Sequence, residues 1–210
     1  MEETAKQYTF EDSLKSIETE NLLDRIFYRP IGYRIALLLA KTPITPNTIT
    51  IISIFIGVFA GILFFPQNIW INIAGFALLV IANILDCVDG QLARLTGIKS
   101  PIGRILDGLA GNLWFISIYI SIALRLSADF GAAVAWTAAT LSGLSNLIQS
   151  NIVDYYKTAH LYFISPKKGS EFETVSSIKA KHNAMPRGLN KSLYVLYVYY
   201  STIQIVITPQ

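Results

Sequence analysis

The chain has 210 residues, of which 52% are hydrophobic and only 15% are charged, and its mean hydropathy is +0.46. Soluble domains carry about 25% charged residues, so the composition excludes an ordinary water-exposed surface, and it excludes a disordered chain, which would be poor in apolar residues. The single cysteine, Cys87, excludes an internal disulfide. The length fits one compact unit. The net charge of +3 is too small to predict a nucleic-acid partner, and we expect none.

Residues 1–41 are polar and charged, and we expect them to form a cytoplasmic N-terminal segment without a cleavable signal peptide. Residues 19–41 mix apolar and basic side chains, which is typical of an amphipathic helix that lies at the membrane surface. An ordinary linker is the alternative.

Long uncharged runs dominate residues 42–210, which we treat as one transmembrane domain. The first run, Thr42–Leu85, has no Asp, Glu, Lys or Arg over 44 residues, and a turn-forming Pro66-Gln67-Asn68 divides it. Because a bilayer span needs about 20 apolar residues, this run accommodates two helices. The whole pattern predicts an all-α integral membrane protein, a polytopic helix bundle, rather than buried helices of a soluble protein. We expect about five transmembrane helices, at residues 47–65, 69–88, 102–125, 130–155 and 190–208.

The last of these spans is unusual, because its uncharged run, Ser192–Gln210, reaches the final residue and is just long enough to cross a membrane. The sequence is compatible with a naturally short last span and with a truncated one.

Basic residues are distributed unevenly between the two ends of these spans. Six precede the first span, three lie between the second and third, and seven lie between the fourth and fifth, whereas the opposite side has only Arg125. Sixteen of the 17 on one side is a clear positive-inside pattern. It predicts a protein of the cell (inner) membrane whose N-terminus and functional end face the cytoplasm.

Three aspartates lie where two predicted spans meet the cytoplasmic side. Asp86 and Asp89 are three residues apart, which places both on one face of the second span. Asp107 follows the predicted start of the third span at Ser100-Pro101, where a hydroxyl cap precedes a proline. Since a short loop joins the two spans, we expect the three carboxylates to meet. An ionisable group at membrane depth costs about 2.5–3.5 kcal/mol or more, so these residues are candidates for function.

Three neighbouring carboxylates repel one another unless a cation lies among them. A hard divalent ion with oxygen ligands, Mg²⁺ or Mn²⁺, is the natural partner. Gly90 and Ala93 leave room beside the aspartates, and Arg94 offers a planar fork suited to phosphate oxygens. The pattern therefore predicts a site for a diphosphate group. Capping and helix packing are the alternatives for the individual residues.

The motif as a whole resembles the signature of the CDP-alcohol phosphotransferase family. That signature runs D-x-x-D-G-x-x-A-R, eight residues, G-x-x-x-D-x-x-x-D, and seven of its eight fixed positions are matched here at the correct spacing. The segment Thr45-Pro46-Asn47-Thr48-Ile49-Thr50 also resembles the family's usual entry into the first span. The similarity is convincing over residues 20–155 and rests on hydropathy alone elsewhere.

By this resemblance, the protein would move a substituted phosphate group from a CDP-linked donor, such as CDP-diacylglycerol, to an acceptor alcohol and release CMP. The ligands of one or two metal ions would be Asp86, Asp89 and Asp107. The CDP moiety of the donor would be bound by Gly90, Ala93, Arg94 and Gly103. The family usually has six spans, and the resemblance also implies a homodimer among membrane lipids.

The sequence departs from the signature at its last position, where the family has an aspartate and this chain has Gly111, followed by Asn112. By resemblance, that aspartate binds metal and is the proposed base for the acceptor hydroxyl. Asp107 and, more weakly, Asn112 are then the catalytic candidates, although an asparagine cannot accept a proton near neutral pH. Three interpretations stay open: another group or the substrate's own phosphate takes the proton, the enzyme is weak or inactive, or the protein only binds CDP-lipids.

We therefore expect a metal-dependent enzyme of phospholipid synthesis. An aspartate-rich membrane prenyltransferase would also hold a diphosphate through magnesium, but Ala93, Arg94 and the spacing to Gly103 argue against it. A transporter would place its charges near the bilayer midplane. Glycerol phosphate, inositol phosphate, serine and diacylglycerol are all compatible acceptors.

Overall fold

The structure is a computed structural model that describes residues 9–14, 20–98 and 100–164, together with isolated residues at 180, 182–184, 191, 194, 195, 198 and 202. Within this part of the chain the fold is helical and contains no strand, which confirms the predicted all-α class. The long helices are α1 (Arg29–Leu39), α2 (Pro46–Ile62), α3 (Ile69–Thr96), α4 (Pro101–Phe130) and α5 (Ala132–Ile164). Two short turns precede them, a 3-10 turn η1 (Glu11–Ser13) and a π-helical turn η2 (Asp24–Tyr28).

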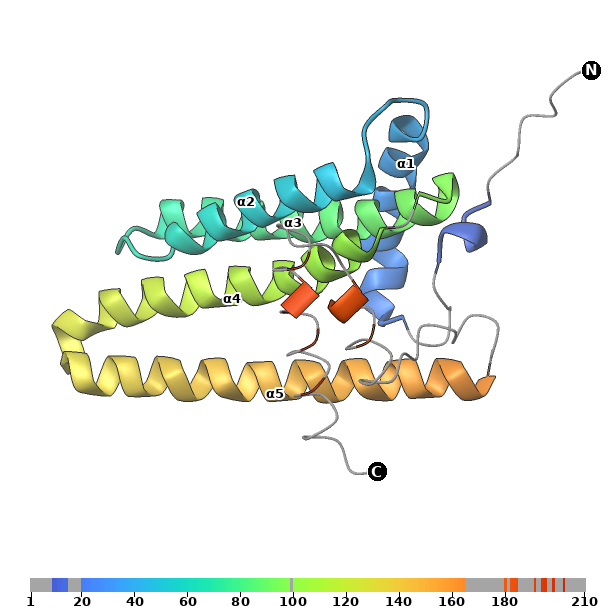
Figure 1. Cartoon of the computed structure of the whole chain (residues 1–210). Helices are drawn as coiled ribbons and strands as arrows, with labels where there is room; N and C mark the ends of the chain where they lie inside the picture. The colour runs from blue at the N-terminus through green and yellow to red at the C-terminus, as the bar shows by residue number, and fades with distance from the viewer. Residues whose placement is uncertain are drawn as a thin grey trace, which may run out of the picture.

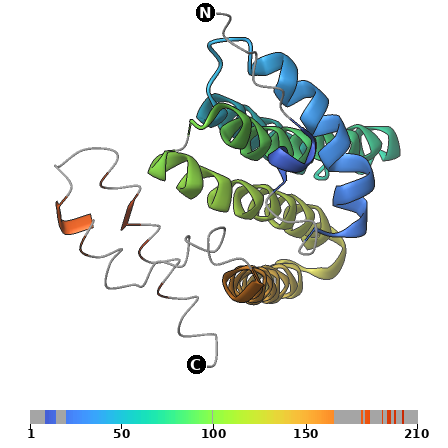
Figure 2. The same ribbon diagram turned by 90° about the vertical axis from the view of Figure 1, so that its right-hand side faces the viewer.

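Helices α2 to α5 lie alongside one another, and α1 crosses them at the end where α2 and α4 begin and α3 finishes (Figure 1). Helix α2 packs against both α3 and α4, α4 packs against α5, and α1 packs against α3. In the view along α5, α4 lies between α5 and the α2–α3 pair (Figure 2). This topology gathers residues from α1, α2, α3 and α4 at one end of the bundle.

The helix ends follow the capping residues in the sequence. The Thr45 side chain caps α2 ahead of Pro46, and the Asn68 side chain accepts from the first backbone N–H groups of α3. Helix α4 begins at the expected point, because the Ser100 hydroxyl accepts from the Gly103 N–H at 2.8 Å. Helix α3 ends at Gly97, whose φ of 73° is a left-handed conformation that favours glycine.

Among the described residues, two helices are long and apolar enough to cross a membrane, α3 and the Leu106–Phe130 part of α4. Helix α2 is shorter, with 17 residues. Helix α3 continues to Thr96, beyond the predicted end of the second span near residue 88. Its extension is stabilised by packing, because Val88, Leu92 and Leu95 form a buried cluster with Ala36 of α1 and Ile49 of α2. The predicted span 190–208 lies outside the described residues, except for residues 191, 194, 195, 198 and 202.

The region expected to form the N-terminal amphipathic helix is helical from Leu22 to Leu39, with the π-helical turn η2 inside it. One side of α1 is buried against α3 through Gly32 and Ala36. By contrast, Leu22, Leu23 and Ile26 are 73%, 62% and 67% exposed. The segment therefore presents apolar side chains that no described part of the chain covers.

Helices α2 and α4 approach each other closely along their middle. A Cβ atom at Gly57 would lie 2.2 Å from Cδ1 and Nε1 of Trp114, so only glycine leaves room for the buried indole. One turn further on, the Ser117 hydroxyl donates to the Val58 carbonyl at 2.8 Å. These contacts fix the spacing of the two helices next to the site.

The opposite end of the bundle is closed by polar side chains. Arg125 of α4 donates to the Asn72 amide oxygen at 3.0 Å, and the Asn72 amide nitrogen donates to the carbonyls of Leu63 and Pro66 at 2.9 and 3.0 Å. The loop between α2 and α3 is thus tied to α4 at this end.

Candidate functional site

Asp89 occupies the most enclosed position among the predicted metal ligands. It lies on α3 and is only 4% exposed, which is unusual for a carboxylate. The Thr50 hydroxyl of α2 donates to its Oδ2 atom at 2.5 Å and also lies 3.1 Å from the Pro46 carbonyl oxygen. Thr50 is itself buried, so this contact fixes the orientation of the Asp89 carboxylate from the neighbouring helix.

The other two carboxylates lie near Asp89. Asp86 is one turn earlier on α3 and half-buried, and Asp107 is exposed near the start of α4. The charge of Asp107 acts on both Asp86 and Asp89, and those two also interact with each other. The fold thus brings the three predicted ligands into electrostatic contact across the α3–α4 junction.

These side chains do not surround a ready-made metal site in the structure. Within the described ranges, no group of three or more His, Cys, Asp or Glu side chains surrounds a common point. The donor chemistry nevertheless fits a hard divalent cation, because three carboxylates whose charges act on one another need a positive charge among them. The role of these residues as metal ligands remains a prediction.

Arg94 lies beside Gly90, as the diphosphate prediction requires. An ideal Cβ at Gly90 would be 3.2 Å from Arg94 Nη2, so the terminal guanidinium nitrogens cover the glycine. The positive charge of Arg94 also acts on Asp89. The Arg94 Nε atom donates to the main-chain carbonyl oxygen of Ser13 at 2.5 Å, a contact that sequence spacing did not predict. Ala93 is half-buried on the same helix.

Gly103 lies where the starts of α2 and α4 meet. A Cβ there would come within 2.5 Å of Asn47 Oδ1, the same oxygen that accepts from the Ser100 hydroxyl at 3.0 Å. In the described arrangement Gly103 therefore permits close helix packing. Its predicted place in the CDP pocket is not tested by this contact.

Gly111 follows Asp107 by four residues, one turn further along the same face of α4. No atom lies within 4 Å of an ideal Cβ at this position, so the space that an aspartate would occupy is open. The amide nitrogen of Asn112 donates to the Gly108 carbonyl at 2.9 Å, within its own helix. Asn112 is therefore engaged with the α4 backbone in this arrangement.

The start of α1 borders the site through an ion pair. Arg29 Nε and Nη2 each lie 3.0 Å from a carboxylate oxygen of Glu20. Burial lowers the pKa of Arg29, but electrostatic interactions with Cys87, Glu20 and Asp24 outweigh that effect and raise it overall. The ion pair fixes the chain where it enters α1.

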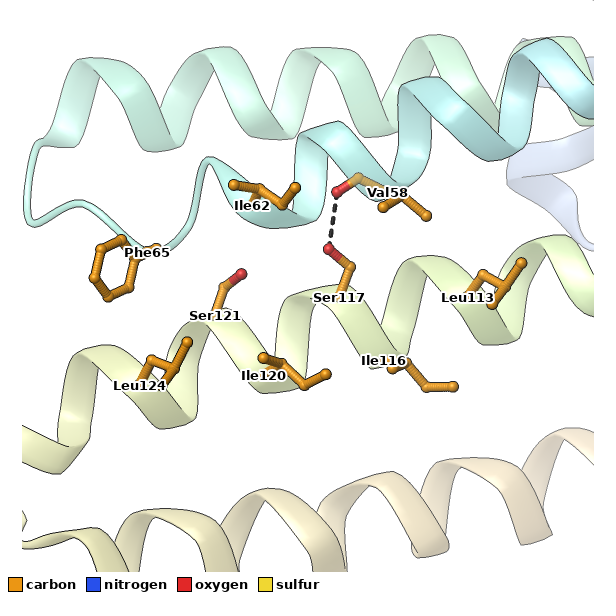
Figure 3. Close-up of a pocket in the computed structure, with 9 residues that line it drawn as sticks. All are labelled: Val58, Ile62, Phe65, Leu113, Ile116, Ser117, Ile120, Ser121 and Leu124. Carbon is orange, nitrogen blue, oxygen red and sulfur yellow. Dashed lines mark hydrogen bonds between the residues drawn. The ribbon is translucent and has the colours of Figure 1, made fainter.

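An apolar cavity of about 450 Å³ begins beyond this polar end (Figure 3). It lies between α2 and α4, and the hydroxyls of Ser117 and Ser121 are its only polar lining groups among the described residues. The remaining lining residues are Val58, Ile62, Phe65, Leu113, Ile116, Ile120 and Leu124. On α4 this lining starts at Leu113, two residues after Gly111. Two residues correspond to about 200° around a helix, so the cavity lies on a different side of α4 from Gly111.

Sequence reasoning missed three residues that contact the site. Thr50 was part of the quoted entry motif, but nothing in linear spacing showed that it faces Asp89, 39 residues away. Gln91 occupies a variable position of the signature, and Ser13 lies in a segment without a recognisable pattern. Only tertiary structure relates Ser13 to Arg94, which is 81 residues away.

Known sequences resemble this chain over the region that contains the candidate site. The chain matches the sequence description of the CDP-alcohol phosphatidyltransferase family over residues 43–179. It is 38% identical over 122 residues to an archaetidylinositol phosphate synthase of Pyrococcus horikoshii, which covers 58% of each chain. It is 28% identical over 125 residues to a phosphatidylinositol phosphate synthase of Corynebacterium glutamicum, covering 59% of this chain and 54% of that one.

A third relative is a bifunctional IPC transferase and DIPP synthase of Aquifex aeolicus. The identity is 27% over 161 residues, which covers 75% of this chain and 35% of that protein. The matched region therefore spans between about a third and three fifths of the length of these three relatives. Because the family match extends over more than half of the chain and includes every aspartate of the site, the protein belongs to the CDP-alcohol phosphatidyltransferase family.

Proposed function

We propose that this protein is a membrane-embedded transferase that moves a substituted phosphate group from a CDP-linked lipid to an acceptor alcohol and releases CMP. The observation that supports the proposal is that the charges of Asp86, Asp89 and Asp107 act on one another at one end of the bundle, where the charge of Arg94 also acts on Asp89. This set combines oxygen donors for a cation with a fork for phosphate oxygens, which together recognise a nucleotide diphosphate.

Proteins of this family generally depend on a divalent metal. Asp86, Asp89 and Asp107 would hold Mg²⁺ or Mn²⁺ here, as one or two ions. When bound, the cation would supply positive charge that offsets the charge developing on the CMP leaving group. The chain's own contribution is to hold Asp89 in one orientation through Thr50 and to offer Arg94 to the diphosphate oxygens.

The Thr50→Val substitution should leave the Asp89 carboxylate less firmly oriented, while the size of the side chain at position 50 stays nearly the same. The Asp89 carboxylate loses its hydroxyl donor, and we expect the Mn²⁺ concentration for half-maximal activity to rise by about threefold to tenfold. A Mn²⁺ titration of CMP release measures this effect. Thr140→Val on α5, whose hydroxyl donates only to its own helix at the Trp136 carbonyl, is the matched control. Equal titration midpoints for wild type and Thr50→Val would contradict the proposed role of Thr50.

The lipid part of the donor matches the apolar cavity between α2 and α4. We propose that an apolar chain of the donor extends into it, since its lining is apolar and it lies further along α4 than Asp107. The exposed apolar residues Leu22, Leu23 and Ile26 would then lie against the membrane surface. We further propose that the protein has five transmembrane spans and forms a homodimer. Its N-terminus and the end of the bundle that carries the aspartates would face the cytoplasm.

The names of two of the compared relatives point to an inositol-containing product. We propose that the acceptor is inositol phosphate and the product a phospholipid that carries it. The Gly111 position keeps a second function open, because a protein without the usual base could bind CDP-lipid without turning it over.

A single experiment separates these functions. Purified protein is given CDP-diacylglycerol, Mn²⁺ and a mixture of inositol phosphate, glycerol phosphate, serine and diacylglycerol, and the lipids formed are identified by mass spectrometry. We expect CMP release and a lipid that carries inositol phosphate. Metal-dependent binding of CDP-diacylglycerol without CMP release would support the binding-only function, and absence of both would refute the proposal.

A further inference from the structure

The N-terminal segment Thr9–Leu14 lies against the end of α3 that carries the signature residues. Ser13 and Leu14 are buried, with Ser13 0% exposed. The Phe10 ring contacts the edge of Tyr33 on α1, with ring centroids 5.4 Å apart. The segment is therefore packed into the fold next to the site.

Ser13 is the centre of a hydrogen-bond network in this region. Its carbonyl oxygen accepts from Arg94 Nε at 2.5 Å, and its hydroxyl accepts from the Gln91 side-chain amide at 3.1 Å. The same Gln91 nitrogen lies 3.1 Å from the Arg29 carbonyl oxygen. Gln91 therefore connects the N-terminal segment and α1 to α3, one turn before Arg94.

These contacts determine how the guanidinium of Arg94 is presented. The group is planar and rigid, so a bond at Nε restricts the direction of both terminal nitrogens. Those nitrogens lie over Gly90, where an ideal Cβ would be 3.2 Å from Nη2 and 3.6 Å from Nη1. A flexible arginine without the Ser13 contact would lose side-chain entropy on binding a ligand, whereas a restrained one has already lost it.

We propose that Ser13 and Gln91 are positioning residues, which hold Arg94 in the orientation that binds the diphosphate of the donor. This inference rests on the proposed function, because it takes the donor to be a CDP-lipid. It adds that the N-terminal segment, which lies outside the family signature, is part of the donor site through Arg94.

The test measures the Kd of CDP-diacylglycerol with Mn²⁺ for the full chain in detergent, for Ser13→Ala, Arg94→Ala and the double variant. Ser13→Ala keeps the main-chain carbonyl that accepts from Arg94. It removes the hydroxyl that accepts from Gln91 and donates to the Phe10 carbonyl, so the Ser13 carbonyl is held less firmly. We expect a Kd weaker by about threefold to tenfold, the size of one lost hydrogen bond. In the Arg94→Ala background the same Ser13 substitution should leave Kd unchanged, because the residue it positions is gone. Gln91→Met, which removes the amide that donates to the Ser13 hydroxyl, should weaken Kd in the same direction as Ser13→Ala.

Ser127→Ala is the matched control, since it removes a hydroxyl that donates to the Ala123 carbonyl near the opposite end of α4. Its Kd should equal that of wild type. A merely structural role of Ser13 predicts the same loss of affinity with and without Arg94, and that result would overturn the inference. Wild-type affinity in both Ser13→Ala and Gln91→Met would overturn it as well. Failure of the wild-type protein to bind CDP-diacylglycerol would instead refute the proposed function, and the inference with it.

Discussion

The Asp89→Asn variant should lose metal-dependent binding of CDP-diacylglycerol and release CMP about 100-fold more slowly or worse, since changing even a partner of a metal ligand costs about 10–100-fold. The substitution keeps the size of the side chain and leaves one oxygen to accept from Thr50. What it removes is the negative charge at the most buried of the three aspartates. The loss can therefore be attributed to charge rather than to packing.

Two measurements check this prediction, a binding titration with CDP-diacylglycerol at increasing Mn²⁺ and an assay of CMP release. Asp129→Asn is the matched control, because Asp129 is exposed near the other end of α4 and should retain wild-type affinity and rate. Unchanged affinity in Asp89→Asn would show that the three aspartates do not form the donor site.

The Gly111→Asp variant should turn over faster than the natural sequence, with kcat higher by about tenfold or more, because a general base contributes about 10²–10⁴-fold. The new carboxylate would lie one turn from Asp107 in space that is open in the structure. It would restore the last aspartate of the family signature, the proposed acceptor of the proton from the attacking hydroxyl.

Gly111→Asn distinguishes the proton acceptor from a mere filling of space. It has nearly the same size as aspartate but cannot take up a proton near neutral pH, so we expect no gain in kcat. CMP release under saturating donor, acceptor and Mn²⁺ measures both variants. A flat or lower rate in Gly111→Asp would mean that another group already accepts the proton.

Local sequence signals predicted the helices and several of their ends well. The start of α4 follows from the Ser100 cap and Pro101, and the start of α3 from the turn at Pro66-Gln67-Asn68. These ends depend on hydrogen bonds within three residues, which a sequence displays directly. Helix α3 continues beyond the predicted span 69–88, because its last two turns are stabilised by packing on α1 and α2 rather than by an uncharged run.

In the candidate site, too, local spacing could be read from the sequence, whereas contacts made by tertiary packing could not. The spacing of Asp86, Asp89 and Asp107 placed them near enough for their charges to act on one another, because helix geometry and a short loop leave few alternatives. Their meeting at a common metal stays a prediction. Thr50 and Ser13 could not be found in this way. Their contacts with Asp89 and Arg94 depend on how α2 and the N-terminal segment lie against α3, and no residue pattern encodes that packing.

The contact between Gly57 and Trp114 bears on whether water and ions can pass between α2 and α4. The indole fills the seam between α2 and α4 beyond Gly111, with no room at Gly57 for even a methyl group. At this depth the contact between the indole and the α2 backbone leaves no gap between the two helices. In the proposed membrane-embedded arrangement, this tight packing would oppose the passage of water and ions along the interface of α2 and α4.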